Sequence, residues 1–180
     1  VFRYDTTQPD SPDRIRIYVN GTLDERSGSP YIPGVNTVIS SMNVNGRQQR
    51  IGRYVSSLSR YFNGYMAEIH MVDGQSLDPS NFGETVGGVW VPKKYDDNGT
   101  TSHGANGYHL TFEGTGTSTT TDGTTAQTNI GDDQSGNGNN WAANNFASTD
   151  VMLDSPTNNF ATMNLLYHSS SQAALTEGNL

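Results

Sequence analysis

One stretch near the middle of the chain, residues 61–77, limits the fold more than any other. A run within it, residues 65–72, alternates between two faces, and the face predicted to point inward holds Tyr65, Ala67, Ile69 and Met71. A period of two is typical of a β-strand with one buried face and one wetter face. The dipeptides Asn63-Gly64 and Asp73-Gly74 bound this run, and such dipeptides favour turns. The stretch therefore predicts a central strand that is closed by a turn at each end.

Other short strands, with turn signals between them, predict an antiparallel all-β fold. Residues 14–19 alternate, and Asn20-Gly21 directly after them is a strong signal for a hairpin. After the central strand, Asp78 is placed to cap a short helical turn that Pro79 opens. Further strands are expected at residues 1–4, 36–45, 48–55, 88–92 and 107–113. In the last of these strands, the residues predicted to point inward are Tyr108, Leu110 and Phe112.

Composition supports a turn-rich β protein and excludes several classes of function. Hydrophobic residues make up only 32% of the 180 residues, and glycine contributes 20 of them. A net charge of −8 disfavours nucleic-acid binding, because an acidic surface repels phosphate backbones. The absence of cysteine excludes disulfides and thiolate metal sites. No apolar run approaches the roughly 20 residues that span a bilayer, so we expect no membrane insertion.

The last third of the chain differs in composition from the rest. Residues 114–129 are nearly all Thr, Gly, Ser and Gln, which is too polar for a buried core. We therefore expect one β domain at 1–113 and, at 114–180, either a long irregular extension that orders against a partner protein or a linker to a further domain. The apolar side chains expected to anchor that contact are Trp141, Phe146, Met152, Leu153, Phe160, Leu165 and Leu166.

The order of strand, turn and capped turn in residues 61–81 resembles the end of a laminin-G or concanavalin-A-like jelly roll. The strings FNGYMAEIHMVDGQSLDPSNFGE, GVWVPKKY and DQSGNGNNW also resemble a virion appendage protein of tailed bacteriophages. The resemblance extends over residues 1–164. It implies an antiparallel jelly-roll sandwich whose first strands precede residue 1. It also implies a virion component that is assembled in the bacterial host cytoplasm, contacts other virion proteins and forms a homo-oligomer.

Catalysis is not expected from this sequence, although many sandwiches of this class hydrolyse polysaccharides. Glycosidases place two carboxyl groups across the sugar bond, and the related hydrolases carry them on one strand as E-x-D-x-E. None of the five glutamates begins that motif, and the residue two positions after Glu68 is His70. No G-x-S-x-G elbow for a serine nucleophile occurs either. We therefore predict a protein that is not an enzyme.

Residues 132–139 form the best candidate for a calcium site. The oxygen-bearing side chains that alternate there belong to Asp133, Ser135, Asn137 and Asn139. Hard cations such as Ca²⁺ take oxygen ligands, and the laminin-G resemblance adds that such modules often bind calcium. The alternative interpretation is a cluster of Asn/Gly turns that is closed by its own side-chain hydrogen bonds. The four histidines are expected at the surface, since only His103 and His109 are close in sequence.

Two classes of binding function stay open. Exposed aromatic rings stack on the apolar faces of sugars, and the candidates in polar, loop-like surroundings are Trp90, Tyr95 and Trp141. The same three rings also suit anchoring in a core or an interface. Our first hypothesis is an assembly or attachment module of a phage fibre, tail or capsid decoration. The second is a lectin-like module that binds host-surface glycan, and a polysaccharide depolymerase is a distant third.

Overall fold

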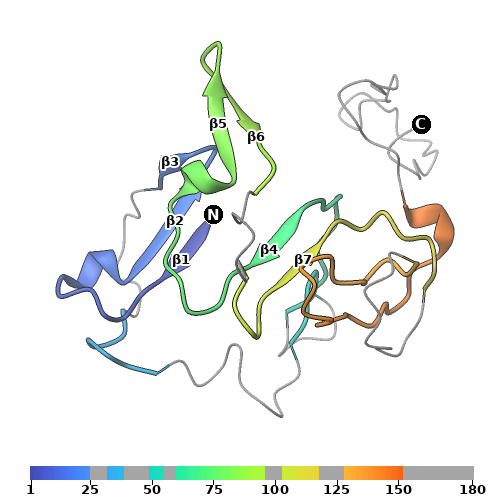
Figure 1. The fold of residues 1–180 in the computed structure, drawn as a ribbon, viewed down its shortest axis with the longest axis horizontal. Coiled ribbons are helices and arrows are strands. Elements are labelled where there is room, and N and C mark those ends of the chain that lie inside the picture. The colour runs from blue at the N-terminus through green and yellow to red at the C-terminus, as the bar shows by residue number, and fades with distance from the viewer. Residues whose placement is uncertain (25–31, 39–48, 55–59, 96–102, 118–127, 152–180) are drawn as a thin grey trace, which may run out of the picture. The chain divides into compact units, whose positions relative to one another are not determined.

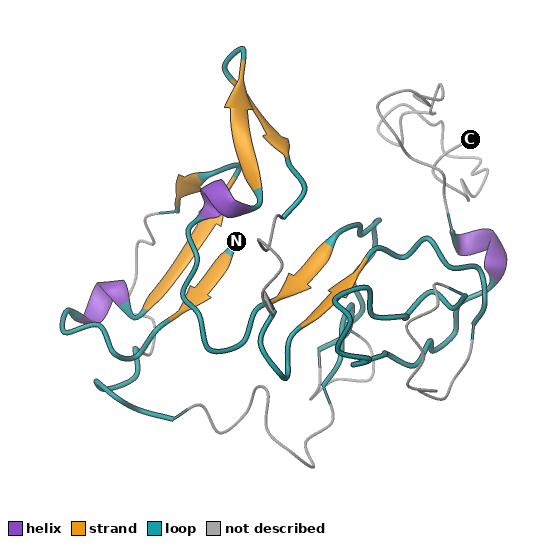
Figure 2. Cartoon of the chain, viewed as in Figure 1, coloured by secondary structure: helices purple, strands orange, loops and turns teal. Residues whose placement is uncertain are grey.

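The computed structural model describes residues 1–24, 32–38, 49–54, 60–95, 103–117 and 128–151. Within these ranges the regular structure is mostly strand, which confirms the β-rich class (Figures 1 and 2). The strands are β1 (Phe2–Tyr4), β2 (Ile15–Val19), β3 (Thr22–Leu23), β4 (Ile69–Met71), β5 (Gly83–Val86), β6 (Val89–Pro92) and β7 (Tyr108–Leu110). The 3-10 helices are η1 (Ser11–Asp13), η2 (Pro79–Asn81) and η3 (Ser148–Asp150). None of these described helices has the length and hydropathy to cross a membrane.

The chain forms two compact units. The first unit holds residues 1–65 and 72–106, and the second holds residues 66–71 and 107–180. This grouping differs from the division after residue 113 that composition suggested. The difference arises because contacts place residues 66–71 and 107–113 with the polar segment that follows them. Each unit is described below by itself.

A three-stranded antiparallel meander, in the order β1-β2-β3, opens the first unit. The turn between β2 and β3 is the one predicted from Asn20-Gly21, and both residues have positive φ, 49° and 77°. Two left-handed residues in succession give the turn whose twist matches that of the flanking strands, and Asn-Gly adopts it readily. This hairpin prediction is confirmed, with Val19 opposite Thr22.

A second hairpin in the first unit pairs β5 with β6 through Gly87-Gly88, both of positive φ. The predicted edge strand at residues 88–92 is confirmed as β6. Its Trp90 ring lies so close to Gly21 and Gly83 that an added methyl group at either would come within 2.5 Å of a ring carbon. Glycine at these two positions is thus required by the close approach of the indole.

Several details of the first unit differ from expectation. The turn that Pro79 opens is present as η2, but Asp78 does not cap it with its side chain. The Asp78 carboxylate instead accepts a 2.8 Å hydrogen bond from Arg3. Of the strands expected at residues 36–45 and 48–55, the described parts form only an isolated bridge between Arg53 and Tyr61. The remainder of those two segments lies outside the described residues.

In the second unit, β4 and β7 pair in antiparallel register, with Ile69 opposite Leu110 and Met71 opposite Tyr108. Among the described residues, the hydrophobic core consists of Leu110, Ile130 and Ala143, which all belong to this unit, whereas the buried Pro33 and Pro79 belong to the first. Leu110, at 1% exposure, is the best covered of them, so its predicted inward orientation is confirmed. A short third segment extends the pair, because Gln134 N–H donates to the His109 carbonyl at 2.8 Å.

The predicted central strand at residues 65–72 is wrong in length and partly wrong in its faces. β4 begins only at Ile69, because Glu68 has a left-handed backbone with φ of 52° and cannot continue a pleated strand. Tyr65 and Ala67, expected inward, are exposed. Phe112 has φ of 61°, outside the extended region, and β7 ends two residues before it.

Residues 128–151, which belong to the segment expected to be an irregular extension, pack within the second unit. The Trp141 ring lies edge-on against Tyr108, with ring centroids 5.1 Å apart, and the main-chain N–H of Trp141 donates to the Gly131 carbonyl. The carboxylates of Asp132 and Asp133 are buried and accept hydrogen bonds from this segment. Satisfied polar groups thus take the place of the missing apolar residues, which composition alone did not reveal.

Candidate metal centre

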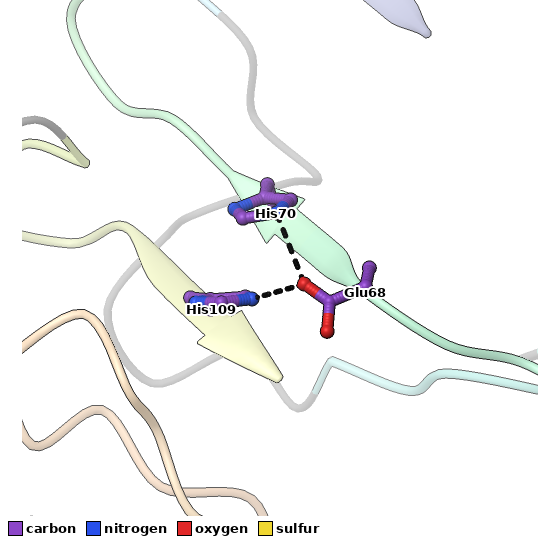
Figure 3. Close-up of side chains that lie close together, drawn as sticks. All are labelled: Glu68, His70 and His109. Carbon is purple, nitrogen blue, oxygen red and sulfur yellow. Dashed lines mark hydrogen bonds and ion pairs between the residues drawn. The ribbon is translucent and has the colours of Figure 1, made fainter. Parts of the chain in front are cut away.

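Glu68, His70 and His109 lie together in the second unit (Figure 3). His70 and His109 are direct partners in the β4–β7 ladder, and their rings stack with centroids 4.0 Å apart and planes 16° apart. Glu68 Oε2 is 2.7 Å from His109 Nε2 and 3.7 Å from His70 Nε2. The three potential ligand atoms all lie within 4.8 Å of one another.

The local backbone explains why these three side chains meet. Two opposite residues of an antiparallel pair project to the same face of the sheet, and this brings the imidazoles together. Glu68 stands directly before β4 with its left-handed φ of 52°. Such a conformation costs about 1–3 kcal/mol for a residue other than glycine, and strain of this kind clusters at functional sites. The Glu68 carboxylate is held at the imidazoles by a backbone that is unusual for its residue type.

One side of the cluster is open to solvent. The Glu68 side chain is 53% exposed, whereas the His70 and His109 side chains are 13% and 20% exposed. The main chain of His109 is fixed on both sides, since its N–H donates to Asp133 Oδ1 at 2.8 Å and its carbonyl accepts from Gln134. The two imidazoles therefore rest on a supported strand pair, and the carboxylate is the accessible member.

Asp133 is the centre of the supporting network and is fully buried. Its Oδ1 accepts the main-chain N–H groups of His109 and Ser135, both at 2.8 Å. Its Oδ2 accepts the Ser135 hydroxyl at 2.8 Å and the Asn139 main-chain N–H at 2.9 Å. Four donors around one carboxylate tie the segment 133–139 to β7.

The four residues of the predicted calcium site are thus brought close together. Asp133 and Ser135 bond to each other, and the side-chain amides of Asn137 and Asn139 both donate to the Gly107 carbonyl, at 3.0 and 2.8 Å. The polar atoms of these residues serve the loop itself, as in the alternative interpretation of an Asn/Gly turn cluster. Calcium binding here stays a prediction.

The aromatic residues predicted to stack on sugars are each half-buried in their own unit. Trp90 packs on two glycines, and Tyr95 lies between Phe82 and His103, with centroid distances of 5.0 and 5.2 Å. Trp141 packs on Tyr108. Sugar stacking by these rings stays a prediction, as does the anchoring role of Trp141. Of the other predicted anchors, Phe146 is exposed, and the following lie outside the described residues: Met152, Leu153, Phe160, Leu165 and Leu166.

Sequence reasoning missed the His70–His109 pair. The histidines were expected at the surface. This is wrong for His103, which is buried, and His70 and His109 are only partly exposed. The available signal was that His70 and His109 each lie at the middle of an alternating run. Only the pairing of two strands far apart in the sequence joins them, and no local motif encodes that pairing.

Two imidazoles and one carboxylate are a familiar ligand set for transition metals. Zn²⁺ binds histidine nitrogen at about 2.0–2.1 Å and carboxylate oxygen at about 2.0–2.2 Å, and it keeps an open position when three side chains bind it. Without a metal, the same groups form an ordinary hydrogen bond in which the His109 ring N–H donates to Glu68. The arrangement thus has two chemically distinct uses, structural and metal-binding.

Comparison of the chain with protein-family models, with curated proteins and with solved structures gave no match. The likeness to phage virion proteins and to laminin-G modules stays a prediction from the sequence strings.

Proposed function

We propose that this chain is a non-enzymatic structural module that attaches to neighbouring protein chains through its first unit. One observation supports this most strongly. Among the described residues, twelve of the thirteen exposed large hydrophobic side chains lie in the first unit, whereas the core residues Leu110, Ile130 and Ala143 lie in the second. Apolar side chains that gather in one patch mark interaction surfaces, and we infer such a surface from two groups of residues in the first unit.

The β5–β6 hairpin supplies one part of this surface. Val86 and Val89 face each other across the ladder beside Gly87-Gly88, and they are 57% and 63% exposed. Complete burial of a valine against a partner stabilises by roughly 1.5–3 kcal/mol relative to exposure. The backbone of this apolar pair is already fixed by strand pairing. Another chain can therefore cover it with little further loss of conformational entropy.

A second part surrounds the bridge between Arg53 and Tyr61. Arg53 lies over the Tyr61 ring at 5.5 Å, and Arg60 lies over the Tyr54 ring at 5.7 Å. Both tyrosines are exposed, as is the neighbouring Phe62. Tyrosine and arginine are enriched at the energetic centres of protein interfaces. Each of the two exposed tyrosines thus has an arginine from the same segment beside its ring.

The finer proposal follows the resemblance noted in the sequence. The antiparallel sheets of the first unit are proposed to be part of a laminin-G or concanavalin-A-like jelly roll. The module then belongs to a fibre, tail or capsid decoration of a phage particle, is assembled in the host cytoplasm and functions as a homo-oligomer. Its net charge of −8 supports a protein partner rather than nucleic acid.

Binding of host-surface glycan is the alternative, and it has weaker support. Trp90, Tyr95 and Trp141 are half-buried against neighbouring groups, so each offers only part of its ring to a sugar. The exposed Tyr54 and Tyr61 are better placed for stacking, but an arginine already lies over each ring.

Self-association of the full chain tests the assembly proposal. Sedimentation equilibrium should show the native chain forming an oligomer, and Val86→Ser combined with Val89→Ser should weaken that association at least about tenfold, a change of about 1.4 kcal/mol. Thr85→Ser on the same hairpin is the matched control and should leave the association unchanged. Equal association of all three proteins would contradict the role of the hairpin. A monomeric chain that binds saturably on a glycan array would favour the lectin-like alternative.

A further inference from the structure

We propose that Glu68, His70 and His109 form a binding site for a divalent transition metal, of which Zn²⁺ is the best fit. The site belongs to the second unit and does not depend on the assembly proposal, which concerns the first. It rests on the side-chain geometry of His70 and His109, from two paired strands, and of Glu68, which directly precedes β4.

The ligand atoms lie near the separations found around a tetrahedral ion, and the side chains must adjust to reach them. Ligand bonds of about 2.0–2.2 Å at tetrahedral angles separate neighbouring ligand atoms by about 3.4 Å. The separation of Glu68 Oε2 from His70 Nε2, 3.7 Å, is already close to this value. The separation of Glu68 Oε2 from His109 Nε2, 2.7 Å, is that of a hydrogen bond and must lengthen when an ion replaces the proton. The half-exposed Glu68 side chain has the freedom to make this movement.

The two rings must also turn for both nitrogens to point at one ion. At present the imidazoles are nearly parallel, with an angle of 16° between their planes. A ring lone pair lies in the plane of its ring, so convergence on one ion requires rotation about the Cβ–Cγ bonds. That torsion is broad in histidine, and rotation needs no movement of the backbone that β4 and β7 fix.

The donor set selects the class of metal. Imidazole nitrogen suits Zn²⁺, Cu²⁺ and Ni²⁺, whereas Ca²⁺ and Mg²⁺ take oxygen ligands. With two nitrogens and one carboxylate, the site should prefer Zn²⁺ over Ca²⁺ strongly. Three side chains leave the fourth tetrahedral position to water or to a ligand from outside the unit.

The supporting contacts fix the backbone that carries one of the ligands, and the ligand side chains adjust on that backbone. The main chain of His109 is held by the buried Asp133 carboxylate and by Gln134. Outer groups that fix ligand positions typically change metal affinity by 10–100-fold. The left-handed backbone of Glu68 has no role in strand pairing, and it places a carboxylate beside both imidazoles.

Titration with Zn²⁺, followed by isothermal calorimetry on the full chain, tests the proposal. The native chain should bind one equivalent at this site, and His70→Gln and Glu68→Gln should each weaken that binding at least about tenfold. Glu84→Gln, which removes an exposed carboxylate from the first unit, is the matched control and should bind as the native chain does. Far-UV circular dichroism establishes that the variants stay folded.

Cobalt provides an independent readout of the ligands. Co²⁺ bound to the native chain should give the visible absorption of a tetrahedral nitrogen and oxygen site, and this signal should be lost in His109→Gln. No saturable Zn²⁺ binding by the native chain would overturn the proposal. So would a site whose affinity and Co²⁺ spectrum are unchanged in folded His70→Gln and Glu68→Gln variants.

Discussion

At the scale of single residues, one buried carboxylate holds much of the second unit together. Asp133 accepts four hydrogen bonds, three of them from main-chain N–H groups, while fully buried. Asp133→Ala would leave these donors without an acceptor, and each buried unsatisfied group costs about 1–3 kcal/mol. We expect the free energy of unfolding, measured in urea, to fall by at least about 3 kcal/mol.

The matched control for Asp133 is an exposed carboxylate. Asp78 forms one ion pair with Arg3 and is 68% exposed. Surface ion pairs are worth at most about 1 kcal/mol, so Asp78→Ala should have a small effect. A similar decrease in the free energy of unfolding for Asp133→Ala and Asp78→Ala would show that burial and hydrogen bonding at Asp133 do not stabilise the unit as proposed.

Asp5 supplies a prediction about pH. Hydrogen bonds from the side chains of Thr7 and Gln8 lower the pKa of the Asp5 carboxyl below its ordinary value. A lowered pKa in the folded state means that folding favours the ionised form. The resulting stability is present above the unfolded pKa of about 3.9 and is lost as pH falls through the folded pKa.

We therefore expect Asp5→Asn to be less stable than the native chain at pH 7, with a difference that shrinks as the pH is lowered below about 4. Urea unfolding of both proteins at several pH values measures this difference. A difference that grows with acidity would show that the sign of the Asp5 effect is wrong.

At the scale of elements, the pairing of β4 with β7 builds both the small apolar core and the candidate metal centre. Leu110 lies on this pair at 1% exposure, opposite Ile69. Leu110→Ala should lower the free energy of unfolding by about 2–5 kcal/mol, through lost burial and the cavity left behind. Leu23→Ala on the exposed edge of β3 is the matched control and should cost much less. An equal decrease in the free energy of unfolding for Leu110→Ala and Leu23→Ala would show that Leu110 is not part of the core.

The two hairpins and the β4–β7 pair differ in how far the sequence predicted them. The β2–β3 turn follows from Asn20-Gly21, because the left-handed backbone it needs is a property of those two residues. The pairing of His70 with His109 depends instead on strands far apart in the chain. Neither strand specifies its partner locally, so the histidine pair could not be predicted. The length of β4 was overestimated because alternation does not reveal a left-handed residue such as Glu68.

At the scale of the whole molecule, charge and apolar exposure act in opposite directions on self-association. Copies that each carry a charge of −8 repel one another, and salt screens this repulsion over a Debye length of about 10 Å at 0.1 M. Apolar burial is not weakened by such screening. We expect association to tighten when sodium chloride is raised from about 0.05 to about 0.5 M. Weaker association at high salt would indicate that opposite charges, rather than apolar faces, hold the copies together.

The central claim is that another copy of the chain covers exposed apolar side chains of the first unit, among them Val86 and Val89. Light scattering coupled to size exclusion measures the mass of the native chain in solution most directly. The account predicts a mass that is a multiple of the 19.5 kDa of one chain. The mass should return to that of one chain on dilution or in the Val86→Ser, Val89→Ser variant. A mass of 19.5 kDa at every concentration of the native, folded chain would contradict the claim.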